Sequence, residues 1–266
     1  MDDAELAALR AIDTMRERMG EQLTVDDLAR AAMFSKFHFT RMFQRTTGVS
    51  PGRFLSALRL QRAKDLLVTT SMNVADISIH VGFNSVGTFS SRFSRSVGMS
   101  PTTYRRRAGF AAAIDVDSDV PAGRGSHGSV TCTLRAGHAT DALTFAGLFA
   151  DPIPQGKPVS CAVLDRPGRL RFGAVPAGSW YLLAQSLPAM DADTGQPDRA
   201  DRPVSVASHG PIVVRPDSQL SVEVTLRRFR ALDPPVLLAL LDARKYAIQQ
   251  LNARNALPAG SIAQAA

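Results

Sequence analysis

The sequence predicts two domains: an all-α domain at residues 1–110 and a mostly-β, sandwich-like domain at residues 129–232, followed by a C-terminal helix and tail at 233–266. Three observations lead to this fold class. A helical unit is written twice between residues 23 and 104, and the composition then changes to Ala, Asp, Gly and Ser over residues 111–128, typical of a linker. Beyond this linker the apolar residues recur with a period of two, as in β-strands.

The helical unit is duplicated at almost constant spacing. Its first copy, LTVDDLARAAMFSKFHFTRMFQRTTGVSP, begins at Leu23, and its second, MNVADISIHVGFNSVGTFSSRFSRSVGMSP, begins at Met72. Five residues of the first copy recur 50 positions later: Phe39, Phe43, Gly48, Ser50 and Pro51 correspond to Phe89, Phe93, Gly98, Ser100 and Pro101. A duplicated unit suggests a duplicated task.

Each copy is predicted to form a short helix, a tight turn and a second helix. In the first copy Thr24 can cap a helix over residues 25–32, and Asp27 favours the positive end of that helix. Ser35 is placed to cap the second helix, which Gly48 would end in the left-handed conformation. At the turn Met33 stands where the second copy has Gly82, so a positive φ at that position would strain the first copy modestly.

The second helix of each copy has one apolar face and one polar face. Phe39 and Phe43 share the apolar face, as Phe89 and Phe93 do in the second copy. The opposite face of the first copy carries Phe37, His38, Thr40, Arg41, Gln44 and Arg45. This is a helix-turn-helix pattern, in which the second helix is free to enter a major groove.

The positive charge is concentrated in the helical half. Residues 1–110 hold 16 Lys and Arg against 10 Asp and Glu, whereas residues 111–266 hold 15 against 14. No acidic residue lies between Asp27 and Asp65, or between Asp76 and Asp115. Two basic tracts without acids predict surfaces for a polyanion, although a basic helical bundle with no nucleic-acid role is the alternative.

Residues from about Glu5 to Arg107 resemble the DNA-binding domain of AraC/XylS-type bacterial transcription regulators. The matching segments are SKFHFTRMFQRTTGVSP, RLQRAKDLL, VADI, GFNSVGTFSSRFSRSVGMSP and TYRR. The resemblance implies a unit of about seven helices that places two recognition helices in adjacent major grooves on one face of DNA. The helix after Ser50 and Pro51 would be the rigid rod between the two copies.

The resemblance also assigns base-facing positions. Phe37, Thr40 and Arg41 match those of the first recognition helix, where Arg41 would bind guanine or, alternatively, a phosphate, and Phe37 would pack on a thymine methyl group. His38 is expected to bind a phosphate or a local partner rather than a metal. The complete set of predicted DNA-binding residues is Lys36, Phe37, His38, Thr40, Arg41, Gln44, Arg45, Ser85, Val86, Gly87, Ser90, Ser91, Arg92 and Arg95.

The second recognition helix departs from the family. Its base-facing positions are occupied by Val86, Gly87, Ser90 and Ser91, which are all short, whereas some family members carry long polar residues there. We therefore expect this helix to make fewer base contacts and to rely on arginines and on its N-terminal amides for phosphate binding.

The second half of the chain is expected to be an antiparallel sandwich or barrel. The predicted strands are Ser129–Arg135, Leu143–Ala150, Val159–Leu164, Leu170–Val175, Ser179–Ala184, Val204–Ala207, Ile212–Val214 and Ser221–Leu226. The segment LRFGAVPAGSWYLLAQSL is similar to a hairpin of carboxypeptidase-regulatory-like and prealbumin-type sandwiches. A last helix over Val236–Ala253 would pack on its own sandwich or pair with another chain.

No catalytic or metal site and no cofactor is predicted. The sequence has no Gly-rich phosphate loop, no G-x-S-x-G and no metal-ligand spacing of His and Cys. Some proteins join such a regulator to a methyl-transfer module with an activated cysteine, but Cys132 and Cys161 lie in apolar alternation typical of core residues.

The sequence thus predicts a non-enzymatic, cytoplasmic bacterial transcription factor that binds double-stranded DNA. It contains neither a signal peptide nor an apolar run that would span a membrane. RNA polymerase, a small-molecule effector and a second copy of the chain are the candidate further partners, so the protein would be a monomer or a homodimer. The β-rich half would sense an effector or mediate assembly; a purely protein-interaction domain and a fused enzymatic domain are the alternatives.

Overall fold

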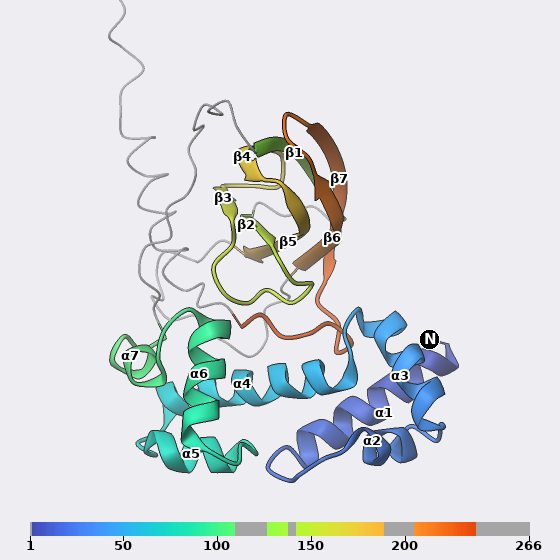
Figure 1. Cartoon of the computed structure of the whole chain (residues 1–266), viewed down its shortest axis with the longest axis vertical. Helices are drawn as coiled ribbons and strands as arrows, with labels where there is room; N and C mark the ends of the chain where they lie inside the picture. Colours follow the sequence, from blue (N-terminus) through green and yellow to red (C-terminus); the bar gives the residue numbers. More distant parts are fainter. Residues whose placement is uncertain (1, 110–126, 138–141, 189–204, 238–266) are drawn as a thin grey trace, which may run out of the picture.

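The computed structural model describes residues 2–109, 127–137, 142–188 and 205–237, which form a helical part and a β-rich part (Figure 1). The helical part contains α1 (Asp3–Glu17), α2 (Val25–Ala31), α3 (Lys36–Thr47), α4 (Pro51–Thr69), α5 (Val74–His80), α6 (Val86–Val97) and α7 (Pro101–Arg106). The expectation of seven helices is thereby confirmed. Within the described ranges no helix is long and apolar enough to cross a membrane.

Side-chain caps and glycines define where the helices of each copy begin and end. Thr24 forms a capping box with Asp27 at the start of α2, and the Ser85 hydroxyl accepts a hydrogen bond from the Thr88 amide at the start of α6. Gly48 and Gly98 end α3 and α6 with φ of 80° and 92°. Such angles favour glycine, so these two residues stop the recognition helices at equivalent places.

Aromatic side chains form the core of each copy. The ring centroids of Phe39 and Phe43 are 5.4 Å apart, and Phe43 makes an edge contact with Phe54 of α4 at 5.5 Å. In the second copy Phe93 contacts Phe89 and Tyr104 at 5.6 Å each. The shared helix α4 contacts α1, α2 and α3 on one side of the repeat and α5 and α7 on the other, so it joins the two copies as predicted.

The first helix buries a face made largely of alanines. Ala7, Ala8 and Ala11 are buried with Ile12 and Met15, whereas Leu6 is 37% exposed. Small alanines let α1 approach α2 and α3 closely, and Leu6 lies at the margin of this contact.

The β-rich part is a single seven-stranded sheet. Its strands are β1 (His127–Ala136), β2 (Ala142–Phe149), β3 (Ser160–Leu164), β4 (Arg169–Pro176), β5 (Gly178–Pro188), β6 (Ser205–Val214) and β7 (Gln219–Arg228). The order is β3-β2-β5-β6-β7-β1-β4, with β1 and β7 parallel and the other pairs antiparallel. Because the two end strands β3 and β4 lie close together, the sheet is nearly a closed barrel rather than two separate layers.

Two details of the strand prediction are wrong, and the sheet that was expected to be antiparallel also contains the parallel pair of β1 and β7. β4 and β5 do not form a hairpin: β4 pairs with β1, and β5 pairs with β2 and β6. Only Ala177 separates these strands, which is too short for the usual two-residue hairpin loop, so the chain turns a corner instead. The two strands expected around Gly210 are one strand, β6, which pairs with β5 on both sides of an irregularity between Trp180 and Leu182.

The helical core is completed by residues of the β-rich part. Ile153 follows β2, while Leu232 and Leu237 follow β7, and all three side chains are buried in the same cluster as the aromatic residues of the helices. Polar contacts join the same surfaces, since the Lys64 ammonium donates to the Val236 carbonyl at 3.1 Å and Arg53 pairs with Asp151 at 2.9 Å. The two parts therefore share one hydrophobic core at their junction.

Three predicted segments fall largely or wholly outside the described residues. These are the linker over residues 111–128, the loop over residues 190–202 and the last helix over Val236–Ala253. Leu237, which was expected on that helix, lies in the core of the helical part.

Candidate nucleic-acid interface

The predicted side chains of the first copy lie on the exposed face of α3. Their placement follows from the burial of Phe39, Met42 and Phe43, which turns the opposite stripe of the helix toward solvent. Within that stripe Lys36, Phe37, His38, Arg41, Gln44 and Arg45 are exposed and Thr40 is half-buried. Phe37 is 74% exposed, which is unusual for so large an apolar side chain and marks a contact surface.

Phe37 and Arg41 form a pair on this stripe. They are one helical turn apart, and the Arg41 guanidinium lies 5.7 Å from the centroid of the Phe37 ring. A cation over an aromatic face is attracted by the ring quadrupole, so the ring restricts the orientations of the guanidinium. The pair presents a planar donor beside an apolar surface, which is the combination that reads guanine next to a thymine methyl group.

Other members of the stripe have partners within the protein. The His38 ring stacks on Phe34 with centroids 4.9 Å apart, so His38 has a local partner, while its contact with a phosphate stays a prediction. Lys36 pairs with Asp26 of α2 at 2.8 Å, and the Thr40 hydroxyl donates to the Lys36 carbonyl at 2.9 Å. Arg41, Gln44 and Arg45 are the other exposed long polar side chains of this stripe.

The equivalent face of α6 carries shorter side chains at its first two turns than the exposed face of α3. Ser85, Val86, Gly87, Ser91, Arg92 and Arg95 are exposed, and Ser90 is half-buried. A Cβ atom on Gly87 would meet no atom within 4 Å, so the glycine leaves open space at the start of the helix. The first turn therefore offers backbone amides at a positive helix end, and the two arginines follow along the same helix.

Three basic residues counted in the charge analysis have structural roles. The Arg59 guanidinium donates to the carbonyls of Met19 and Glu21 at 3.0 and 2.6 Å, and burial, followed by the nearby charge of Arg92, lowers its pKa. Arg105 donates to the Leu67 carbonyl at 3.0 Å, and Lys64 is buried against Val236. The charge pattern alone did not distinguish these residues, which bind backbone carbonyls, from free cations on the surface.

Two residues of the candidate interface, Gln22 and Asn84, were not predicted from the sequence. Gln22, which precedes α2, donates to the Asn84 side chain at 2.6 Å. Both residues line a polar hollow of about 280 Å³ between the two copies, together with Arg59, Arg92 and the start of α6. Their only signal in the sequence is position, because each lies next to a helix start in its own copy.

The surroundings of Cys132 bear on the alternative of an activated cysteine. Cys132 is buried, and that burial raises the pKa of its thiol to about 12, far from the value of an activated nucleophile. Among the described residues no three His, Cys, Asp or Glu side chains are grouped so as to hold a metal ion.

Two similar copies of a helix-turn-helix unit joined by one helix define a class of DNA-binding domain. A family model described as a helix-turn-helix domain matches residues 28–107. These residues are an AraC-type helix-turn-helix domain, which lies at the N-terminal end of this chain.

Several known proteins resemble a part of this chain. The uncharacterized HTH-type transcriptional regulator YbfP of Bacillus subtilis is 32% identical over 101 residues, which are 38% of this chain and 34% of that protein. The HTH-type transcriptional activator AarP of Providencia stuartii is 33% identical over 84 residues, covering 32% and 62%. A crystal structure of the DNA-binding domain of AdpA in complex with a target DNA is 31% identical, covers 40% of this chain and 93% of that one, and has a TM-score of 0.36.

The matched region spans about a third of the length of the first curated relatives.

Proposed function

We propose that this protein is a sequence-specific transcription regulator that places α3 and α6 in successive major grooves of double-stranded DNA. The observation that carries the proposal is the exposed pair of Phe37 and Arg41 on α3. An aromatic side chain that is three-quarters exposed finds apolar contact in the major groove, and the adjacent guanidinium can donate two hydrogen bonds to one guanine.

The two recognition helices have unequal roles in this proposal. α3 reads bases through Phe37 and Arg41, with Gln44 and Arg45 completing the same face. α6 carries short side chains at its first turn, so its backbone amides approach the DNA phosphates directly while Arg92 and Arg95 neutralise them. Affinity then depends on salt through the arginines and lysines of both helices, whereas sequence selection depends mainly on α3.

The test is selection of binding sites from random duplex DNA with the full chain, followed by affinity measurements on the selected site. Arg41→Ala should cost about 1–3 kcal/mol on that site and relax the preference at one position. Arg171→Ala is the matched control, because it removes the same charge from an exposed position of β4. Ser91→Ala should matter less than Arg41→Ala.

The possible results separate the proposed roles. An equal loss of affinity on every DNA sequence would make Arg41 a phosphate contact, and a larger effect of Ser91→Ala would exchange the roles of α3 and α6. If the full chain selects no sequence at all, the proposed regulator function is wrong.

A further inference from the structure

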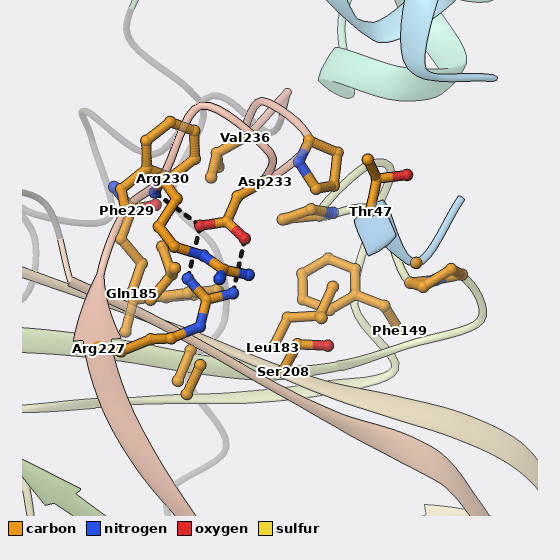
Figure 2. A pocket seen from close by; sticks show the side chains of 18 of the residues that line it. Thr47, Phe149, Leu183, Gln185, Ser208, Arg227, Phe229, Arg230, Asp233 and Val236 are labelled. Atoms are coloured by element: carbon orange, nitrogen blue, oxygen red, sulfur yellow. Dashed lines mark hydrogen bonds and ion pairs between the residues drawn. The ribbon is translucent and has the colours of Figure 1, made fainter. Parts of the chain in front are cut away.

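A hollow lies between the β-rich part and the C-terminal end of α3. Its volume is about 300 Å³, at the lower end of the roughly 300–1,000 Å³ found for small-molecule sites. Figure 2 shows Thr47 and Phe149 on one side of it, and Gln185 and Phe229 on the other. The hollow plays no part in the proposed contacts with DNA.

The floor of the hollow is the outer face of three adjacent strands. Phe145 of β2, Gln185 of β5 and Val206 of β6 stand in one cross-strand row. Leu183 and Ser208 stand in the next row, and Phe149 packs with Leu183 in a small apolar cluster separate from the barrel core. An outward-facing apolar surface on a barrel needs a cover, and the part of the chain that the structure describes covers this surface incompletely.

One polar atom in this floor has no partner. The side-chain oxygen Oε1 of Gln185 is buried and accepts no hydrogen bond from the described residues, because its cross-strand neighbours Phe145 and Val206 are apolar. Most buried polar atoms are satisfied, so a buried acceptor that faces a cavity indicates a missing donor.

The charged groups at the rim are already paired. Arg227 holds the Asp233 carboxylate through two hydrogen bonds of 2.6 Å, and the Arg230 amide donates to the same carboxylate at 2.7 Å (Figure 2). The Arg230 guanidinium reaches Glu5 of α1 at 3.4 Å. Because each guanidinium has a carboxylate partner, the site has no uncompensated charge for an ion to neutralise.

We propose that this hollow is an effector site for an uncharged, mainly apolar molecule of one or two fused rings that donates a hydrogen bond to Gln185 Oε1. Its apolar body lies on Phe149 and Leu183, and its donor satisfies the orphan oxygen. Occupancy of the site changes the affinity of the protein for DNA. This second statement rests on the proposed function, whereas binding to the hollow does not.

The walls of the hollow connect it to both recognition helices. Thr46, Thr47 and Gly48 at the end of α3 form one wall directly. Pro152 and Pro154 form another, and they belong to the segment between β2 and β3 that also contacts α6. There the Ser96 hydroxyl donates to Gln155 at 3.0 Å, and the Gly156 amide donates to the Ser96 carbonyl at 2.8 Å. A molecule that displaces these walls therefore moves the ends of α3 and α6 relative to each other.

The experiment uses two matched pairs of probes on the full chain. 2-Naphthol and indole carry the donor, while 2-methoxynaphthalene and 1-methylindole are the same ring systems with the donor methylated. Binding is measured without DNA, by ligand-observed NMR. We expect saturable binding of the two donors, and binding at least about ten-fold weaker for their methylated partners, because a site built to pair a polar group rejects the analogue that lacks it.

Two variants place the binding in the hollow. Ser208→Phe fills it from an exposed position of β6, and Ser179→Phe makes the same change at an exposed serine of β5 that does not line it. Gln185→Met keeps the size of the side chain and removes the acceptor. Donor probes should bind to the Ser179→Phe protein as to the unchanged chain, should lose binding to Ser208→Phe, and should lose their advantage over the methylated probes with Gln185→Met.

Each outcome decides part of the proposal. Absence of binding for both donors, or equal binding to the Ser208→Phe protein, overturns the site. Equal binding of donor and methylated probes overturns the role of Gln185. Fluorescence anisotropy with the selected duplex then tests regulation: an affinity shift of about three-fold or more that is absent in Ser208→Phe supports it, and no shift overturns it. Failure to bind any DNA would refute the proposed function alone, because the NMR result still decides the site.

Discussion

The turn between the two helices of each copy offers a test in which one sequence difference predicts opposite effects. Met33 adopts φ of 64° in the first copy, and Gly82 adopts φ of 85° at the equivalent place in the second. A residue with a Cβ atom pays about 1–2 kcal/mol for this conformation, whereas glycine does not. The replacement of Gly82 by Met33 at the equivalent position of the first copy predicted this strain.

Met33→Gly should stabilise the protein. The Met33 side chain is 77% exposed and has one weak contact, from the Arg10 guanidinium to its sulfur at 3.5 Å, so little packing is lost. Removing the strain gains about 1–2 kcal/mol, and the greater freedom of glycine in the unfolded chain returns roughly 0.4–1 kcal/mol of it. The net gain is about 0–1.6 kcal/mol, and its midpoint of about 0.8 kcal/mol corresponds to an increase in Tm of about 3–6 °C for a domain of roughly 60–100 residues.

Gly82→Ala should do the opposite. Its Cβ atom would lie 2.4 Å from the Met19 carbonyl oxygen and 2.6 Å from the Arg59 guanidinium, so the backbone has to shift and the Arg59 clamp is disturbed. Strain of about 1–2 kcal/mol and overpacking of about 1–3 kcal/mol, less the roughly 0.4–1 kcal/mol by which alanine restricts the unfolded chain, give a loss of about 1–4.6 kcal/mol. Thermal unfolding of the full chain, followed by its helical circular dichroism, measures both variants. A destabilised Met33→Gly protein, or a Gly82→Ala protein as stable as the unchanged chain, would refute the assignment of the two turns.

Three further predictions concern a cap, a junction and a thiol. Thr24→Ala should cost about 1 kcal/mol by removing the cap of α2. The Thr24 hydroxyl also lowers the pKa of Asp27. The loss of stability should therefore be greatest above pH about 4 and should shrink as the pH falls through the lowered pKa of Asp27. Urea unfolding across a pH series measures this loss, and a loss that grows in acid would contradict the prediction. Ile153→Ala should cost about 2–5 kcal/mol and lower the melting temperature of the helices, although Ile153 lies in the β-rich part. An unchanged unfolding transition of the helical part in calorimetry would show that the two parts have separate cores. Cys132, whose pKa is raised to about 12, should resist a thiol reagent at mildly alkaline pH until the chain unfolds, and rapid labelling of the folded protein would show it to be accessible.

The helical part was predictable because its determinants are local. The phenylalanine spacing, the cap at Thr24 and the glycines at the ends of α3 and α6 each act within a few residues, and the phenylalanines and glycines appear in both copies. The cap expected at Ser35 is the exception, because its side chain makes no capping hydrogen bond. The exposed stripe of α3 followed from the same periodicity, since burial of one face of a helix turns the opposite face to solvent. Its residues in the described structure lie where the sequence placed them, while their contacts with DNA remain predictions.

The β-rich part was predictable only as strands. Alternation marks where a strand lies but carries no information about which strand is its neighbour, because pairing depends on residues far apart in the chain. The expected β4–β5 hairpin failed for this reason, and the parallel pair of β1 and β7 has no local signal at all. The division of the charge was similarly incomplete, since Arg59, Lys64 and Arg105 look like surface cations until their carbonyl partners are known.

The sequence by itself determined the class of the helical domain, the position of its recognition helices and the choice of Phe37 and Arg41 as candidate readers of bases. Only the tertiary structure decided that Ile153, Leu232 and Leu237 complete the helical core, and that an apolar hollow with an unpaired Gln185 oxygen lies against the end of α3. The physical reason is the distance along the chain between the residues that interact. Helix periodicity and capping act between residues a few positions apart, whereas a cavity and a shared core exist only where segments more than a hundred residues apart are brought into contact.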